Sequence, residues 1–116
     1  MAGTSARRRL GDRGEQLAAA WYLGHGYEIL DRNWRCAVGE IDLVLRKGAT
    51  VVICEVKTRS SLAYGSPGEA VTGRKRTRLR RLAARWLVTH SVHAHTVRFD
   101  VAAVLGDHLE ILESVW

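Results

Sequence analysis

Apolar residues recur with two different periods along this chain of 116 residues, and the changes of period divide it into elements. In residues 73–90 the apolar positions follow the i, i+3, i+4, i+7, i+8 spacing that is typical of an amphipathic helix. They are Leu79, Leu82, Ala83, Trp86 and Leu87. Thr72 is a suitable N-cap for this helix, and a first helix is predicted from about residue 11 to residue 23, before the sequence GHG.

The remaining apolar segments alternate with a period of two or are short and continuous, which favours β-strands. The predicted strands are residues 27–35, 40–46, 51–58, 97–104 and 109–116. The order α-β-β-β-α-β-β predicts an α/β domain with a central mixed sheet flanked by helices. The sequence contains no repeat or linker, so we expect one domain over residues 1–116, with a flexible basic segment at residues 1–10.

The central hairpin has a register that can be worked out from its turn. A two-residue turn at Gly48 and Ala49 suits a glycine-first hairpin loop and pairs the flanking residues 47 and 50. This register places Asp42 opposite Glu55, and residue 40 opposite residue 57. Because side chains alternate, these four charged residues share one face, and the apolar residues share the other face, which is expected to pack as core. The apolar residues are Ile41, Leu43, Leu45, Val52, Cys54 and Val56.

Two carboxylates directly opposite each other are unfavourable in a sheet, more so when they are partly buried. A divalent cation such as Mg²⁺ or Mn²⁺ removes this repulsion, since such ions take one or two carboxylates together with water and phosphate oxygens. Lys57 lies where its ammonium can reach a water molecule or a phosphate. Asp42, Glu55 and Lys57 therefore match the parts of a metal-assisted phosphodiester hydrolase. The alternative interpretation is an ordinary solvent-exposed face in which Glu40 and Lys57 form a cross-strand pair.

The formal net charge of +6 directs attention to the second predicted helix, which carries seven basic residues and no acidic residue between positions 74 and 85. Four of them follow one helical stripe: Arg74, Arg78, Arg81 and Arg85. Lys75, Arg76 and Arg80 widen it. Such a stripe suits the phosphates of a nucleic acid. The alternatives are a solvated face without a partner, or a membrane surface, which is disfavoured because the apolar face of the helix is needed for the core.

Other residues give weaker signals. Arg59 and Ser60, after the third predicted strand, can hydrogen-bond a phosphate, and Tyr64 can pack either on a sugar or base or on the core. His90, His93 and His95 can bind Zn²⁺, although solvated histidines at a helix end are the simpler interpretation. The two cysteines lack CxxC spacing, and the sequence has neither a membrane-length apolar run nor a signal-peptide pattern. These features favour a reducing cytoplasm and no membrane partner.

The spacing D-x(12)-E-V-K resembles the core motif of the PD-(D/E)xK, or restriction-endonuclease-like, nucleases, with Ile41 where the motif has proline. The blocks GDRGEQLAA, GEIDLV, EVKTRSS and YGSPGEAV, followed by the basic helix, resemble the YraN-like family of small bacterial proteins. That family is grouped with archaeal Holliday-junction resolvases. The resemblance implies an α-β-β-β-α-β nuclease core, a divalent metal, branched or single-stranded DNA as substrate, and a homodimer.

Carried over by position, the resemblance implies that Asp42, Glu55 and the Val56 carbonyl hold Mg²⁺ or Mn²⁺. It further implies that Lys57 orients or activates the attacking water, and that Glu15 is the acid that resolvase-like members add from the first helix. Glu15 has an alternative interpretation as half of a capping box with Asp12.

The sequence thus predicts a metal-dependent nuclease. The alternatives are a non-catalytic nucleic-acid-binding module of the same fold, and a scaffold protein whose acidic residues only decorate a solvent-exposed face.

Overall fold

A computed structural model describes residues 6–59 and 73–115, with side chains for residues 12–58 and 73–115. The elements are α1 (Ala6–Gly24), β1 (Glu28–Cys36), β2 (Gly39–Lys47), β3 (Thr50–Arg59), α2 (Gly73–Thr89), β4 (Thr96–Leu105) and β5 (His108–Leu112). The predicted α/β fold and element order are confirmed. Helix α1 begins five residues before the predicted start, in a segment rich in arginine and leucine, which favour helices. The proposed N-cap Thr72 and residues 1–5 of the expected flexible segment lie outside the described residues, whereas residues 6–10 of that segment belong to α1.

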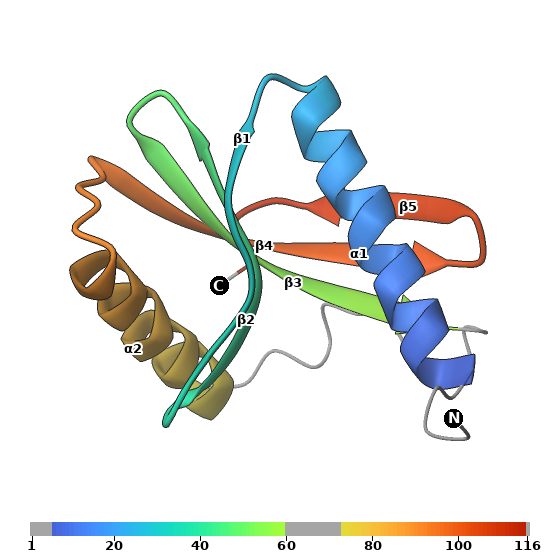
Figure 1. Ribbon diagram of the computed structural model, residues 1–116, viewed down its shortest axis with the longest axis horizontal. Helices are drawn as coiled ribbons and strands as arrows, with labels where there is room; N and C mark the ends of the chain where they lie inside the picture. Colours follow the sequence, from blue (N-terminus) through green and yellow to red (C-terminus); the bar gives the residue numbers. More distant parts are fainter. Residues whose placement is uncertain (1–5, 60–72, 116) are drawn as a thin grey trace.

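The five strands form one mixed sheet in the order β1-β2-β3-β4-β5 (Figure 1). Strands β3 and β4 are parallel and are connected through α2, whereas the other neighbouring pairs are antiparallel. Parallel neighbours need a long connection, and α2 provides it. Strand β3 is therefore interior to the sheet and has a paired neighbour on each side.

The central hairpin turns as the sequence predicts. Lys47 pairs with Thr50, and Gly48 adopts a φ of 60°, a conformation that favours glycine. The predicted register holds from this pair up to Leu43 and Cys54.

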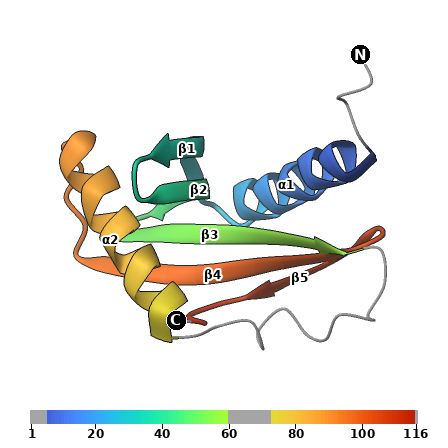
Figure 2. The ribbon, with the colours of Figure 1, turned by 90° about the horizontal axis from the view of Figure 1, so that it is seen from below.

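The prediction that only one face of this hairpin is core is wrong. Alternate residues of β3 are buried on opposite sides: Val52 and Cys54 pack with α1, whereas Val51 and Ile53 pack with α2. Ile41 joins the α2 side and does not share the face of Leu43. The physical reason is that an interior strand with a parallel neighbour is covered on both faces. In Figure 1 the two helices lie on either side of β2, and Figure 2 shows the same arrangement from below.

A buried ionic network ties α1 and the C-terminal segment to β4. The carboxylate of Asp100 is fully buried, and it accepts hydrogen bonds from Tyr22 Oη at 2.7 Å and from two nitrogens of Arg98 at 2.9 Å. Its Oδ1 also accepts the Ser114 amide at 3.1 Å, and Val115 N donates to Phe99 O. Strand β5 therefore ends at residue 112 instead of continuing to residue 116 as predicted, because the following residues fold back to bind Asp100.

None of the helices in the described part of the chain is both long enough and apolar enough to span a membrane. The apolar residues of α2 pack on the sheet.

Candidate functional site

The charged residues of the central hairpin lie where β2 and β3 separate. The ladder between these strands ends at Leu43 and Cys54, whereas β3 stays paired with β4 as far as Arg59. Beyond the last pair, Oδ2 of Asp42 accepts a hydrogen bond of 2.8 Å from the Val56 amide. The predicted cross-strand pair of Asp42 with Glu55 is thus not part of the ladder. Instead, a carboxylate binds the backbone at the point where the strands separate, which we call the fork.

Glu55 is the most crowded carboxylate at the fork. Its Oε1 lies 2.8 Å from the Lys57 ammonium and 3.1 Å from that of Lys75, while Oε2 is buried without a hydrogen-bond partner among the described residues. The predicted pairing of Glu40 with Lys57 is not found, because Glu40 Oε2 binds Arg35 Nε at 2.8 Å. Lys57 therefore binds Glu55 and not Glu40. The buried Oε2 of Glu55 has no donor in the described part of the chain and is available to a ligand.

Asp42 titrates abnormally in these surroundings. Burial raises the pKa of Asp42 to about 6, the hydrogen bond from the Val56 amide works against this, and the charges of Glu40, Glu55 and Glu15 add to the increase. A carboxyl whose pKa is raised by desolvation and by neighbouring charges is typical of a functional site.

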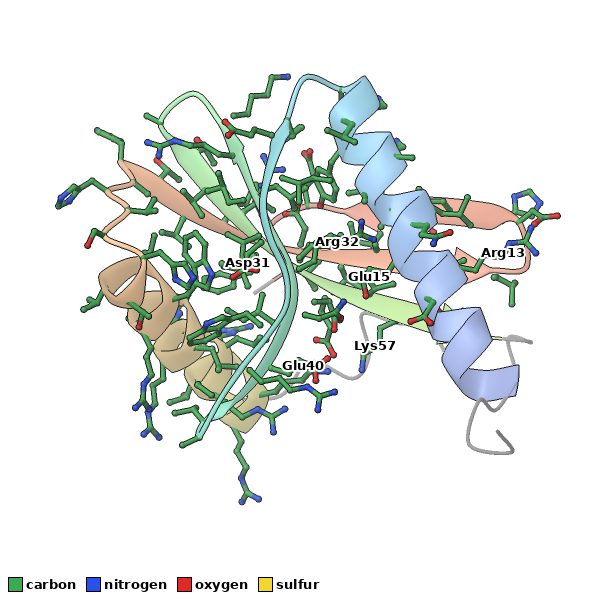
Figure 3. All side chains as sticks on the ribbon, viewed as in Figure 1. Arg13, Glu15, Asp31, Arg32, Glu40 and Lys57 are labelled. Atoms are coloured by element: carbon green, nitrogen blue, oxygen red, sulfur yellow. The ribbon has the colours of Figure 1, made fainter. Side chains whose placement is uncertain are left out.

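Glu15 reaches the same region from α1. It is buried in the middle of the helix, where its Oε1 accepts hydrogen bonds from Asn33 Nδ2 at 2.9 Å and Arg32 Nε at 3.3 Å. Helix α1 starts at residue 6, so the capping-box interpretation is wrong. Figure 3 shows Glu15, Glu40 and Lys57 converging between α1 and β2.

A polar hollow of about 580 Å³ occupies this side of the fork. It is lined by Asp12, Glu15, Asn33, Arg35, Glu40, Asp42, Val56 and Thr58. Helix α1 packs closely against β3 beside it, because a Cβ at Gly14 would lie 2.3 Å from Thr58 Oγ1. The glycine thereby brings Glu15 close to the fork.

A second hollow lies between the sheet and α2, and it contains a residue that the sequence prediction had placed elsewhere. Lys75 is only 15% exposed and points inward to Glu55, although it was predicted to widen the outer basic stripe. Asp42, Glu55, Lys75 and Arg78 line this hollow together with apolar residues of β2, β3 and α2. The spacing of residues 75, 79, 82 and 86 was the available signal, since it places Lys75 on the buried face of the helix.

The arginine stripe forms as predicted on the exposed side of α2. Arg74, Arg78, Arg81 and Arg85 line one groove together with Thr77 and the β1–β2 turn residues Ala37 and Val38. Because Arg78 also lines the hollow that contains Glu55, the basic groove is continuous with the fork.

Comparison with known proteins now adds to this geometry. The profile of a family described as "Uncharacterised protein family UPF0102" matches residues 14–104. The chain belongs to this family. It is 59% identical over 100 residues to the UPF0102 protein of Beutenbergia cavernae, covering 86% of this chain and 85% of that protein. It is 50% identical over 112 residues to the UPF0102 protein of Moorella thermoacetica, covering 97% and 93%.

The segment that matches the UPF0102 profile begins at Gly14, where α1 meets β3, and ends at Val104 in β4. It contains every carboxylate of the fork and all of α2. The matched segment therefore spans both the fork and the basic groove of this chain, whereas β5 lies beyond it.

For the other predicted site residues of this UPF0102 protein, the structure gives less information about a function. The side chain of Arg59, with Ser60 and Tyr64, lies outside the described residues. His90 stacks on Trp86 with ring centroids 4.3 Å apart and lies 3.4 Å from Asp31, whereas His93 and His95 are exposed. Among the side chains that the structure describes, no group of three or more His, Cys, Asp or Glu residues is arranged to hold a metal ion, and this applies to the histidines and to the fork alike.

Proposed function

We propose that this protein hydrolyses phosphodiester bonds of DNA with Mg²⁺ or Mn²⁺, as a member of the restriction-endonuclease-like PD-(D/E)xK superfamily. The observation that carries the proposal is the buried Oε2 of Glu55, which has no hydrogen-bond partner in the part of the chain that the structure describes and lies near Asp42, whose pKa is raised. A buried carboxylate oxygen without a donor is costly unless a ligand satisfies it. Both carboxylates line a hollow with Arg78, and Arg78 also lines the neighbouring groove of exposed arginines, which suits a phosphate backbone.

The donor set fits a hard divalent cation. Asp42 and Glu55 would hold it, with the Val56 carbonyl as a third oxygen, and Mg²⁺ completes such a partial set with water and phosphate oxygens. This donor set contains two side-chain carboxylates and one backbone carbonyl. It is therefore compatible with the finding that the described side chains include no group of three or more His, Cys, Asp or Glu residues arranged to hold a metal ion. When bound, the cation polarises the phosphate and makes a bound water more acidic.

The chain supplies the other functions. Lys57, anchored 2.8 Å from Glu55, is positioned to donate a hydrogen bond to a water or a phosphate oxygen at the fork. Glu15, held by Asn33 and Arg32, adds a negative charge on the α1 side and can orient the water. Deprotonated Asp42 is the form that binds a cation, so cleavage is expected to increase as the pH rises through about 6.

The basic groove suits backbone contacts better than base recognition, because arginines on one exposed helical stripe face a ribbon of phosphates. Branched or single-stranded DNA is therefore the proposed substrate class. Cleavage of both strands at a branch would require two copies of the chain, so a homodimer belongs to the same proposal.

Thermal unfolding with Mn²⁺ and a cleavage assay together test this function. Mn²⁺ is expected to raise the melting temperature of the wild type by about 10 °C, because a ligand at ~100 times its Kd stabilises the folded state by about 2.7 kcal/mol. Glu55→Gln should lose this increase and the cleavage of branched and single-stranded DNA. Glu110→Gln removes the same charge from the exposed face of β5 and should retain both.

Two other outcomes have clear meanings. A wild type that shows neither a metal-dependent increase nor cleavage, even with DNA present, would overturn the nuclease proposal. Metal-independent DNA binding without cleavage would favour the non-catalytic nucleic-acid-binding module, for which the arginine groove is sufficient.

The groove itself makes a separate prediction about salt dependence. Replacing both Arg78 and Arg81 by Ser should weaken binding of single-stranded DNA and reduce the slope of log K against log salt concentration by about 1.4, since each phosphate contact contributes ~0.7. Arg76→Ser with Arg80→Ser removes the same charge from exposed positions outside the groove. Fluorescence anisotropy at several salt concentrations measures both slopes, and equal slopes for the two double variants would contradict the groove assignment.

A further inference from the structure

Two lysines meet at one carboxylate oxygen in a chain whose basic residues are mostly arginines. Only three of the 18 basic residues are lysines, and Lys57 and Lys75 both bind Oε1 of Glu55. Their side chains are 26% and 15% exposed, and that of Glu55 is 20% exposed. A single carboxylate thus carries two ammonium groups in a largely buried place.

The position of Lys75 in its helix is unfavourable for a positive charge. It lies in the first turn of α2, where the helix dipole disfavours a positive charge, and arginines precede and follow it. It also lies on the helix face that buries Leu79 and Leu82. Burial lowers the pKa of Lys75, and the contact with Glu55 counteracts this. The contact with Glu55 therefore favours the charged form of the lysine at this position.

A divalent cation at the fork changes this balance. It would add two positive charges next to Glu55, beside two ammonium groups that are already there, and like charges at such distances repel strongly in a partly buried site. Lys57 is fixed close by because it lies on β3, two residues from Glu55. Lys75 has the same flexible side chain but reaches Glu55 from a different element, α2, and it lines a hollow together with Arg78, which also lines the basic groove. It is therefore the ammonium that can move away.

We propose that Lys75 is an internal counter-ion that occupies Glu55 in the metal-free protein and turns to a phosphate oxygen of the nucleic acid when the cation binds. This inference rests on the proposed function and extends it. Lys75 lines the same hollow as Arg78, and Arg78 also lines the basic groove. A phosphate that binds beside Arg78 is therefore close to Lys75. Metal and nucleic acid then favour each other's binding through one side chain, and such coupling is reciprocal.

Binding of Mn²⁺ alone tests the first half, by titration with electron paramagnetic resonance detection of free Mn²⁺. Lys75→Met keeps a long helix-forming side chain and removes the competing charge, so it should bind Mn²⁺ about 10-fold more tightly than the wild type. Arg80→Met removes the same charge from the exposed side of the same helix and should change the affinity less than ~2-fold, because exposed charges are screened. Lys75→Gln replaces the Met variant if the latter does not fold.

Binding of a fluorescein-labelled DNA junction tests the second half, with Ca²⁺ as the divalent ion. The wild type and Arg80→Met should gain about 10-fold in DNA affinity when Ca²⁺ is added, whereas Lys75→Met should gain less than ~3-fold. Mn²⁺ affinity that is unchanged or weaker in Lys75→Met would overturn the counter-ion role and leave the nuclease proposal standing. A wild type that binds no Mn²⁺, with or without DNA, would overturn both.

Discussion

The Asp42→Asn variant is expected to be more stable than the wild type at pH 8 without metal, and to cleave DNA about 10³-fold more slowly because it lacks a metal ligand. The reason for the first effect is the pKa of Asp42, which burial and neighbouring carboxylates raise from 3.8 to about 6. Above pH 6 the folded protein must hold a charge that the unfolded chain holds more easily. The cost is on the order of 2–3 kcal/mol, and asparagine avoids it.

The sign of this effect gives a pH window. Between pH 6 and pH 4 folded Asp42 is protonated while the unfolded chain is not, so the wild type gains stability as the pH falls through this interval. The advantage of Asp42→Asn should thus be largest above pH 6 and absent near pH 4. Urea unfolding of both proteins at pH 8, 6, 5 and 4 measures it, with exposed Asp107→Asn as the control. A variant that is less stable than the wild type at pH 8, or that still cleaves DNA, would contradict the assignment.

Asp100→Ala is expected to produce the opposite result, a loss of about 3–5 kcal/mol in the free energy of unfolding, because it leaves a buried charge without its partner. Asp100 binds Arg98 through two hydrogen bonds, which raise the pKa of Arg98, and it accepts another hydrogen bond from Tyr22. Burial, more than any contact, raises the pKa of Tyr22.

Urea denaturation at pH 7 measures this loss, and Asp107→Ala, which breaks the exposed pair with Arg13, should change the midpoint little. A loss below ~1 kcal/mol for Asp100→Ala would show that the network is not needed to hold β4, α1 and the C-terminal segment together.

The order of the elements was predictable because α2 and the central hairpin have strong local signals. The apolar spacing from Leu79 to Trp86 fixes α2, and Gly48 fixes the hairpin register as far as Leu43 and Cys54. Both depend only on residues close in sequence. Burial of both faces of β3 was not predictable in this way, since it depends on the pairing of β3 with β4 across the intervening helix.

The candidate site shows the same limit. The sequence brought Asp42, Glu55 and Lys57 together because they share one hairpin. The sequence could not decide between two roles for Glu15, since the predicted start of α1 depended on weak propensities. It also predicted Lys75 on the exposed face of α2, although the helical position of this lysine indicated the buried face. The large number of basic residues on α2 drew attention away from the helical position of Lys75, which it shares with the buried residues.

The irregular pairing of β1 affects how copies of the chain can associate. Strand β1 is an edge of the sheet, and its register with β2 shifts between Ile29 and Asp31. Asn33 has a φ of 52°, and Arg32 and Arg35 are exposed along the same strand. A bulge and charged side chains are known devices that keep an edge strand from recruiting another strand. Pairing of two copies through β1 is therefore disfavoured, and the β1 edge resists the edge-to-edge aggregation to which regular exposed strands are prone.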